Sequence, residues 1–116
     1  MQPNLPEAKR VLLSLRQVLS KRIPILKAEE RSARSEVEVA PEDAASANES
    51  TERLVALTSA QERELGEIDA ALARVDAGRY GNCETCGRAI SANRLQAVPE
   101  ARLCMECSAD LRGERR

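Results

Sequence analysis

Histidine, phenylalanine and tryptophan are absent from the 116 residues of this chain, and Tyr80 is its only aromatic residue. The lack of histidine excludes catalytic arrangements that need an imidazole base, such as the Ser-His-Asp and Cys-His types. Because few side chains here bury a large area, the chain has little material for a large globular core. The scarcity of aromatic and β-branched residues also disfavours a β-sandwich or a β-barrel.

Long hydrophobic runs are missing as well. No stretch of about 18 apolar residues occurs, so the sequence predicts no transmembrane helix. Basic residues interrupt the apolar stretches near the N-terminus, and no signal-peptide cleavage pattern is present. We therefore expect a cytoplasmic protein with no membrane partner.

The net charge of −1 hides a strong segregation of charge along the chain. Residues 1–34 hold eight Lys or Arg and three Asp or Glu, whereas residues 35–50 hold five acids and no base. Residues 51–77 hold six acids and three bases, and residues 78–116 hold seven bases and five acids. A general DNA-binding protein is not expected to concentrate acidic residues in this way.

Alanine, leucine, glutamate and arginine are abundant, which is typical of long exposed helices. Near the N-terminus, apolar residues recur with heptad spacing. Because Pro24 interrupts this stripe, we expect one helix over residues 5–22, and over 25–37 either a second helix or a kinked continuation. The stripe consists of Leu5, Ala8, Leu12, Leu15, Leu19, Leu26, Ala33 and Ala40, widened by Val11, Val18 and Ile25.

A second heptad stripe follows Pro41. Proline favours the first position of a helix, and Glu42 and Asp43 suit the first turn, so we expect a helix to begin at Pro41. Gly78 stands where a glycine commonly ends a helix, which predicts a helix over residues 41–77. Its stripe consists of Ala44, Ala47, Thr51, Leu54, Thr58, Gln61, Leu65, Ile68, Leu72 and Val75.

Neither stripe can be buried by one helix alone, so we expect the two helical segments to fold back on one another as an antiparallel hairpin. The tip of the hairpin then lies near residues 36–46. Five acidic residues fall on or near this tip, namely Glu36, Glu38, Glu42, Asp43 and Glu49. Acidic residues at a helix N-terminus also complement the helix dipole, which is a purely structural explanation for Glu42.

All four cysteines fall in two Cys-x2-Cys pairs, Cys83 with Cys86 and Cys104 with Cys107. Two such turns with a spacer of this length predict a tetrahedral site for one structural Zn²⁺. Two disulfides, which need an oxidising compartment, and a redox-active or redox-switchable site are the alternatives. Four thiolates leave no position for a water ligand, so a catalytic zinc is not expected.

The zinc module contains few apolar residues, so the metal is expected to supply much of its folding free energy. These residues are Tyr80, Ile90, Leu95, Val98, Leu103, Met105 and Leu111, and residues 105–115 are expected to form a short helix. Four arginines add positive charge, namely Arg79, Arg88, Arg94 and Arg102. That charge fits a nucleic-acid-binding zinc ribbon or an ordinary solvated surface.

The predicted fold is therefore mainly α: a long antiparallel helical hairpin followed by a small four-cysteine zinc finger with a short C-terminal helix. We divide the chain into an N-terminal helical segment with the first hairpin arm (1–35), an acidic tip (36–46), a second coiled-coil arm (41–77) and a zinc-finger module (78–116). No histidine, open metal position or phosphate-binding glycine loop is present, so we do not expect an enzyme.

Three runs of sequence resemble one known family. They are Tyr-Gly-Asn-Cys-Glu-Thr-Cys-Gly at 80–87, Arg-Leu-Gln-Ala-Val-Pro at 94–99 and Leu-Cys-Met-Glu-Cys at 103–107. Together with the long helix before them, they are similar to the DksA/TraR four-cysteine zinc-finger proteins, over roughly residues 36–110. The resemblance implies a regulator that binds bacterial RNA polymerase, not promoter DNA, and inserts its coiled-coil tip into the secondary channel of the enzyme.

The resemblance also implies which tip residues contact the polymerase. The tip motif of full-length members is Asp-x-x-Asp-x-Ala, and an ungapped count back from the first cysteine aligns it with residues 40–45. Asp43 and Ala45 match the second Asp and the Ala, whereas Ala40 replaces the first Asp. Glu42 adds a charge nearby. Asp43, Ala45 and Glu42 are therefore the expected polymerase contacts.

The stringent-response alarmone ppGpp acts together with the best-known family members. By the same count, Arg63 keeps one basic position and is a candidate contact for the alarmone or for the polymerase. Other positions that are basic in responsive relatives are Glu67, Val98 and Ser108 here. A highly anionic ligand would meet an acid and lose two partners, so we expect a weak or absent ppGpp response.

Two other functions remain open at this stage. One is a zinc-stabilised, stress-related adaptor whose helical hairpin binds another protein. The other is the nucleic-acid-binding zinc ribbon, whose affinity would fall steeply with salt and would be opposed by the acidic arm.

Overall fold

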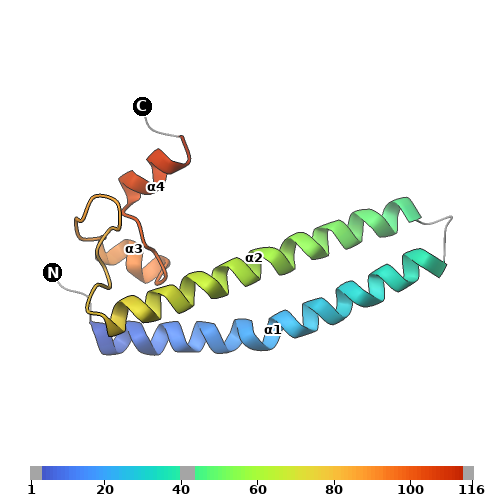
Figure 1. Cartoon of the computed structure of the whole chain (residues 1–116), viewed down its shortest axis with the longest axis horizontal. Coiled ribbons are helices and arrows are strands. Elements are labelled where there is room, and N and C mark those ends of the chain that lie inside the picture. The colour runs from blue at the N-terminus through green and yellow to red at the C-terminus, as the bar shows by residue number, and fades with distance from the viewer. Residues whose placement is uncertain (1–3, 40–43, 114–116) are drawn as a thin grey trace. The chain divides into compact units, whose positions relative to one another are not determined.

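The structure, a computed structural model, describes residues 4–39 and 44–113 (Figure 1). Over these residues the fold is mainly helical, as predicted, and no β-strand forms. Four helices follow one another: α1 (Leu5–Val39), α2 (Ala44–Asp76), α3 (Ala92–Ala97) and α4 (Met105–Leu111). The chain divides into two compact units, residues 17–66 and residues 1–16 with 67–116.

Helix α1 continues through Pro24 without a break. The expected end of a helix at residue 22 was wrong, and the expected kinked continuation is the closer description. A proline in a helix interior costs about 3 kcal/mol. Ile23 and Leu26, on either side of Pro24, are buried. The burial of each side chain stabilises the fold by about 1.5–3 kcal/mol. Pro24 itself is exposed, so packing on the opposite face keeps the helix continuous.

Residues 17–66 form a pair of helical segments. From α1, Leu19, Ile23 and Leu26 are buried, and from α2 Thr58 is buried, with its hydroxyl donating to the Leu54 carbonyl at 2.9 Å. The remaining described positions of the α2 stripe in this unit are half-buried, namely Thr51, Leu54, Gln61 and Leu65. Lys27 of α1 pairs with Glu62 of α2 at 3.1 Å.

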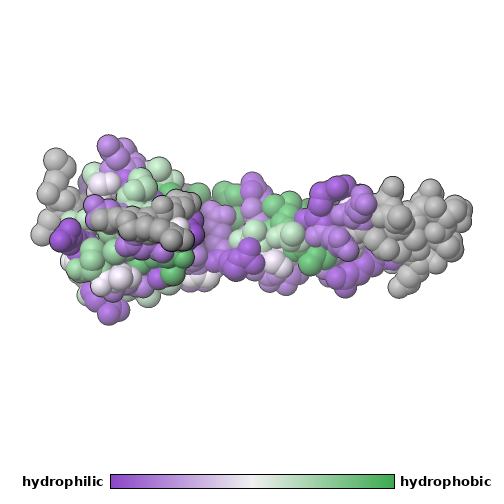
Figure 2. Space-filling view, turned by 90° about the horizontal axis from the view of Figure 1, so that it is seen from above, coloured by the Kyte–Doolittle hydropathy of each residue, from purple (hydrophilic) through white to green (hydrophobic). Residues whose placement is uncertain are grey.

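The expected widening of the α1 stripe was wrong at two positions. Val18 is 47% and Ile25 59% exposed, whereas Ile23, which was not assigned to the stripe, is 8% exposed. The buried positions Leu19, Ile23 and Leu26 are spaced by four and three residues, which keeps them on one face of a helix. On the face seen in Figure 2, hydrophobic and hydrophilic side chains are accordingly interspersed along the helical part of the chain.

In the unit of residues 1–16 and 67–116, the two helical ends pack through Leu12, Ile68 and Ala71, all fully buried. Two exposed ion pairs flank this contact. Lys9 lies 3.4 Å from Asp76, and Arg16 lies 2.7 Å from Asp69. Exposed pairs of this kind contribute less than about 1 kcal/mol each, so the buried side chains supply most of the stability.

Helix α2 ends at a glycine, as predicted. Gly78 has φ of 73°, in the left-handed region that glycine adopts without strain. Its N–H donates to the Val75 carbonyl at 3.2 Å, and the Arg79 N–H donates to the Arg74 carbonyl at 2.8 Å. These two bonds form a Schellman motif, which satisfies carbonyls at the helix end and turns the chain toward the cysteines.

The predicted hairpin tip lies largely outside the described residues. Ala40, Pro41, Glu42 and Asp43 fall there, so the expected helix start at Pro41 stays a prediction, and the described helix begins at Ala44. The division of the chain into arms, tip and zinc module likewise stays a prediction. None of the described helices is long and apolar enough to cross a membrane.

Candidate metal centre

The first cysteine pair lies in a tight hairpin that follows the end of α2. The Cys83 N–H donates to the Arg88 carbonyl at 2.8 Å, and the Gly87 N–H donates to the Cys83 carbonyl at 2.9 Å. Gly87 has φ of 76°, which allows the chain to reverse directly after Cys86. An isolated antiparallel bridge between Asn82 and Ala89 closes the hairpin, so both thiols are held in one turn.

The second cysteine pair begins α4. Cys104 is the N-cap residue of this helix, and its Sγ accepts a hydrogen bond from the Cys107 N–H at 3.4 Å. The Ser108 N–H donates to the Cys104 carbonyl at 2.9 Å, which starts the helical turn. A helical turn brings the side chains at positions i and i+3 to one side, so Cys104 and Cys107 face the same space.

The four Sγ atoms meet in one cluster, in which all lie within 4.8 Å of one another. Cys86 and Cys104, one from each pair, are 3.8 Å apart. None of the four forms a disulfide in this structure. Cys83 is buried, Cys104 and Cys107 are half-buried and Cys86 is exposed. Two turns that are separated in the sequence thus converge on a site for one metal ion. This is the predicted arrangement.

The four thiols of the cluster differ in how readily they ionise. The backbone N–H of Cys86, and more weakly those of Cys104 and Thr85, lower the pKa of Cys83 to about 6 against the opposing effect of burial. The pKa of Cys107 is raised to about 12, chiefly because its thiol donates a hydrogen bond to Cys104 and is desolvated. One thiolate is therefore stabilised by the backbone, while further ionisation brings negative charges together.

A zinc ion fits this donor set. Four thiolates within one cluster match the tetrahedral, all-sulfur coordination of structural zinc sites. A bound Zn²⁺ would draw all four cysteines into the thiolate form, because a divalent cation offsets the repulsion between them. The chain has a binding site for one zinc ion with a structural function.

A small apolar cluster supports the metal site. Of the seven residues expected to surround the cysteines, Tyr80, Ile90, Leu95 and Leu103 are buried. The Tyr80 hydroxyl donates to the Pro99 carbonyl at 2.8 Å, and burial raises the pKa of this tyrosine. The other three, Val98, Met105 and Leu111, are exposed, so they are not part of the core.

Helix α3 was not predicted from the sequence. Its N-cap is Ser91, whose side chain accepts from the Arg94 N–H at 3.2 Å, and Leu95 is its buried residue. A serine directly before the first residue of a helix is a signal for such a start. The expected helix over residues 105–115 is shorter in the structure, where α4 ends at Leu111 and residues 114–116 lie outside the described part.

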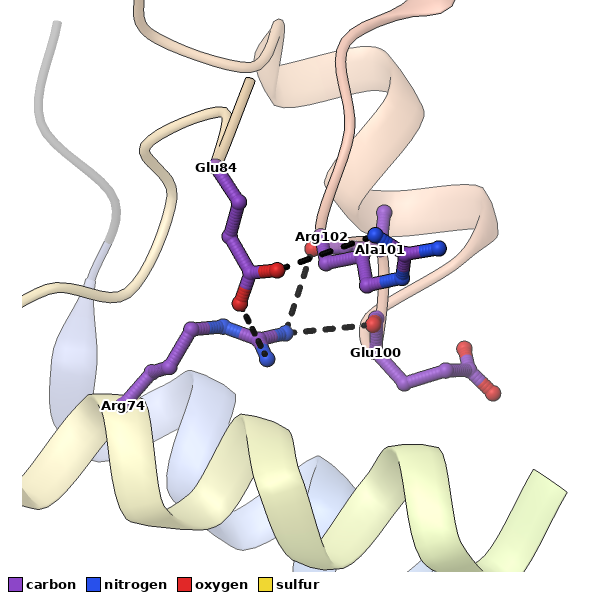
Figure 3. A network of polar contacts seen from close by, with 5 residues as sticks. All are labelled: Arg74, Glu84, Glu100, Ala101 and Arg102. Carbon is purple, nitrogen blue, oxygen red and sulfur yellow. Dashed lines mark hydrogen bonds and ion pairs between the residues drawn. The ribbon is translucent and has the colours of Figure 1, made fainter. Parts of the chain in front are cut away.

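A buried arginine is the main feature of this region that the sequence did not reveal. Arg74, in the last turn of α2, is 7% exposed. Its guanidinium donates to the Glu84 carboxylate at 3.5 Å and to the carbonyls of Glu100 and Ala101 at 3.3 and 3.4 Å. Figure 3 shows these acceptors converging on the guanidinium from two different loops of the zinc module.

The four arginines of the predicted basic patch have different roles in the structure. Arg94 is half-buried and donates to the Leu103 carbonyl at 2.9 Å, and Arg102 lies 3.7 Å from the Glu84 carboxylate. Both guanidinium groups thus have acceptors within the zinc module itself. Arg79 and Arg88 are exposed. The described structure therefore offers less free positive charge than the count of arginines indicated.

The predicted contacts for the polymerase and the alarmone are only partly described. Asp43 and Glu42 lie outside the described residues, and Ala45 lies in the first turn of α2, where only the backbone is described. Arg63 is exposed on α2. Of the other aligned alarmone positions, Glu67 and Val98 are exposed and Ser108 is half-buried. The structure thus brings the four cysteines together, whereas the roles of the tip residues and Arg63 stay predictions.

Comparison with known proteins identifies the zinc module. Residues 78–111 match the model of the prokaryotic DksA/TraR C4-type zinc finger. A segment of 56 residues is 45% identical to the RNA polymerase-binding transcription factor DksA of Caulobacter vibrioides, and 47 residues are 45% identical to general stress protein 16O of Bacillus subtilis. These matches cover 38% and 29% of the two relatives, so they concern about a third of each protein.

A solved structure extends the likeness to the whole chain. The transcription factor DksA2 of Pseudomonas aeruginosa is 32% identical, with a TM-score of 0.76 over 97% of this chain and 91% of that one. The chain belongs to the DksA/TraR family. The family resemblance noted from the three sequence runs is thereby confirmed, and so are the helical fold and the four-cysteine zinc finger of this DksA/TraR protein.

Proposed function

We propose that this DksA/TraR protein regulates transcription by binding RNA polymerase, without catalysing a reaction itself. The observation that carries the proposal is the likeness to transcription factor DksA2, which extends over 91% of that protein's chain. Relatives that match the zinc module are named RNA polymerase-binding transcription factors, which supports the same partner. Promoter DNA is not the expected target, because residues 35–50 hold five acids and no base, which would repel phosphates.

The polymerase contact proposed here is the secondary channel, entered by the connection between α1 and α2. The paired helical segments of residues 17–66, joined by the ion pair between Lys27 and Glu62, provide a two-helix arm. Residues 35–50 at its end hold five acids and no base. In a confined channel such charge is screened less than on an open surface, so one carboxylate can change the stability of a promoter complex.

Within this end, Asp43, Ala45 and Glu42 are the proposed contacts. Asp43 supplies the charge, Ala45 allows a close approach, and Glu42 offsets part of the charge lost where Ala40 stands in place of an aspartate. Arg63 is proposed as a weaker contact, for the polymerase or for ppGpp. Because Glu67 adds negative charge one helical turn further along the sequence, the proposed response to ppGpp is weak or absent.

A transcription assay with purified polymerase on a ribosomal RNA promoter tests the proposal. Zinc-loaded protein is compared with Asp43→Asn, which removes one negative charge from the tip and nearly keeps the shape of the side chain. Asp76→Asn is the matched control, because Asp76 is exposed and lies at the other end of α2. We expect the wild type and Asp76→Asn to change promoter-complex lifetime equally, and Asp43→Asn to bind polymerase with little effect on lifetime.

The alternative function is a stress-related adaptor that binds another protein. General stress protein 16O is 45% identical over 47 residues, which is the observation in its favour. A pull-down from cells that carry the tagged protein separates the two functions. Polymerase subunits dominate the eluate under the proposed function, and their absence together with an unchanged promoter-complex lifetime would favour the adaptor.

A further inference from the structure

Arg74 is a buried cation with acceptors on two loops of the zinc module. Its side chain is 9% exposed, and one of its acceptors is the carboxylate of Glu84 at 3.5 Å. The other two are the backbone carbonyls of Glu100 and Ala101. A buried charge is tolerated only while such partners surround it, because an unpaired charge in the interior costs several kcal/mol. The position of these loops and the burial of Arg74 therefore depend on each other.

Both loops lead directly into a pair of metal ligands. Glu84 follows Cys83 within the first cysteine turn, and Arg102 stands two residues before Cys104. The Glu84 N–H donates to the Arg102 carbonyl at 2.9 Å, and the carboxylate of Glu84 lies 3.7 Å from the Arg102 guanidinium. Figure 3 shows the Glu84 carboxylate in contact with both arginines, while the Arg74 guanidinium also reaches the backbone of Glu100 and Ala101. The network thus connects α2 with both halves of the metal centre.

We propose that Arg74 is a positioning residue for the zinc site, which holds the two cysteine turns at the separation that tetrahedral coordination requires. Glu84 transmits this effect to the first turn, and the loop of residues 100–102 transmits it to the second. Because coupling between two equilibria is reciprocal, zinc binding in turn stabilises the last turns of α2 around Arg74. Partners beyond the ligands themselves commonly change metal affinity about 10- to 100-fold.

Zinc affinity, measured by competition with a chromophoric chelator, tests this proposal without any assay of transcription. Arg74→Met keeps the length of the side chain and removes its charge, and Glu84→Gln removes the carboxylate charge from a half-exposed position. We expect each variant to bind zinc about tenfold more weakly. Arg53→Met, on an exposed part of α2, is the matched control and is expected to bind zinc as the wild type does.

The double variant distinguishes positioning from general destabilisation. If Arg74 acts through Glu84, the loss in the double variant is smaller than the product of the single losses, because the second change removes a contact already broken. Unchanged zinc affinity in both Arg74→Met and Glu84→Gln would overturn the proposal. If Arg74→Met fails to fold, Glu84→Gln alone decides, since its side chain is half-exposed.

Hydrogen exchange of the unchanged protein tests the reciprocal effect. We expect removal of zinc to speed amide exchange in residues 70–77 of α2, and to leave residues 51–62 close to their rate in the zinc-loaded protein. Equal exchange of residues 70–77 with and without zinc would contradict the coupling. A change of the same size in residues 51–62 would also contradict it, because zinc would then stabilise α2 as a whole.

Discussion

The two compact units of the chain are stabilised by different kinds of interaction. Residues 17–66 are two helical segments with a narrow apolar contact, to which Leu19, Ile23 and Leu26 contribute from α1. The other unit also packs two helical ends, through Leu12 and Ile68, but adds a four-thiol cluster and a network around one buried arginine. The stability of residues 17–66 therefore depends on several similar apolar contacts. The stability of the other unit depends on a few groups that each have several partners.

This difference predicts how each unit responds to change. In the helical pair, a substitution removes one contact among several, so its effect is graded and is set by the burial of that side chain. In the metal centre, removal of the ion leaves four clustered thiols without the cation that joins them, and the loops that surround Arg74 lose that support. There the effect extends to the whole module.

Removal of zinc is expected to have the largest effect. Structural zinc ions contribute on the order of 10 kcal/mol to small zinc-finger domains, and the zinc module here has few buried apolar residues to replace that contribution. We expect a strong chelator to abolish amide protection across residues 78–111 while residues 17–35 and 49–66 stay helical. Hydrogen exchange read by mass spectrometry measures both parts in one experiment.

One substitution of a zinc ligand and one matched control substitution check this result. Cys104→Ser should reproduce the effect of the chelator, because it removes one ligand. Ser108→Ala, one helical turn further along α4, should leave zinc binding unchanged. Full protection of residues 78–111 in the absence of zinc would show that the module does not need its metal, and the contrast between the two units would fail.

Within the helical pair, two isoleucines two residues apart should differ sharply. Ile23 is 8% exposed and Ile25 is 59% exposed. We expect Ile23→Ala to lower the free energy of unfolding by about 2–4 kcal/mol, as for other buried isoleucines, and Ile25→Ala to lower it by less than about 0.5 kcal/mol. Urea unfolding of the zinc-loaded variants, followed by circular dichroism, measures both values. Equal losses would mean that α1 presents a different face to α2.

Substitution of two glycines is expected to change the free energy of unfolding by small amounts in opposite directions. Gly78 has φ of 73° and open space around its missing side chain, so Gly78→Ala should destabilise by about 1 kcal/mol through backbone strain alone. Gly66 lies inside α2, also in open space, and Gly66→Ala should stabilise by about 1 kcal/mol through helix propensity. The same urea titration applies, and a shift of the same sign in both variants would contradict the described end of α2.

Much of the fold could be predicted because its signals are local. The heptad spacing indicated helical segments throughout both long helices, although Pro24 was expected to interrupt the first one, and Gly78 indicated the end of the second one. The α1 face was assigned less accurately, because Val18 and Ile25 form a second apolar row beside the buried one. A sequence shows both rows, and only the packing against α2 decides that Ile23 is buried.

The metal ligands could be predicted because their spacing follows from the coordination geometry. Arg74 could not, since an arginine near the end of a helix is normally read as an exposed residue that complements the helix dipole. Its acceptors come from residues 84, 100 and 101, which the fold alone brings together. Helix α3 was missed for a related reason, because six residues are too short for a periodic pattern.

Site-specific crosslinking to RNA polymerase tests the proposed function most directly. A photoreactive amino acid replaces Ser46 near the proposed tip, and the same amino acid at Arg22 on α1 serves as the control. We expect the probe at position 46 to crosslink to polymerase segments that line the secondary channel, and the probe at position 22 to give a different pattern. If the bound protein crosslinks from position 46 only outside the channel, the secondary-channel function is contradicted.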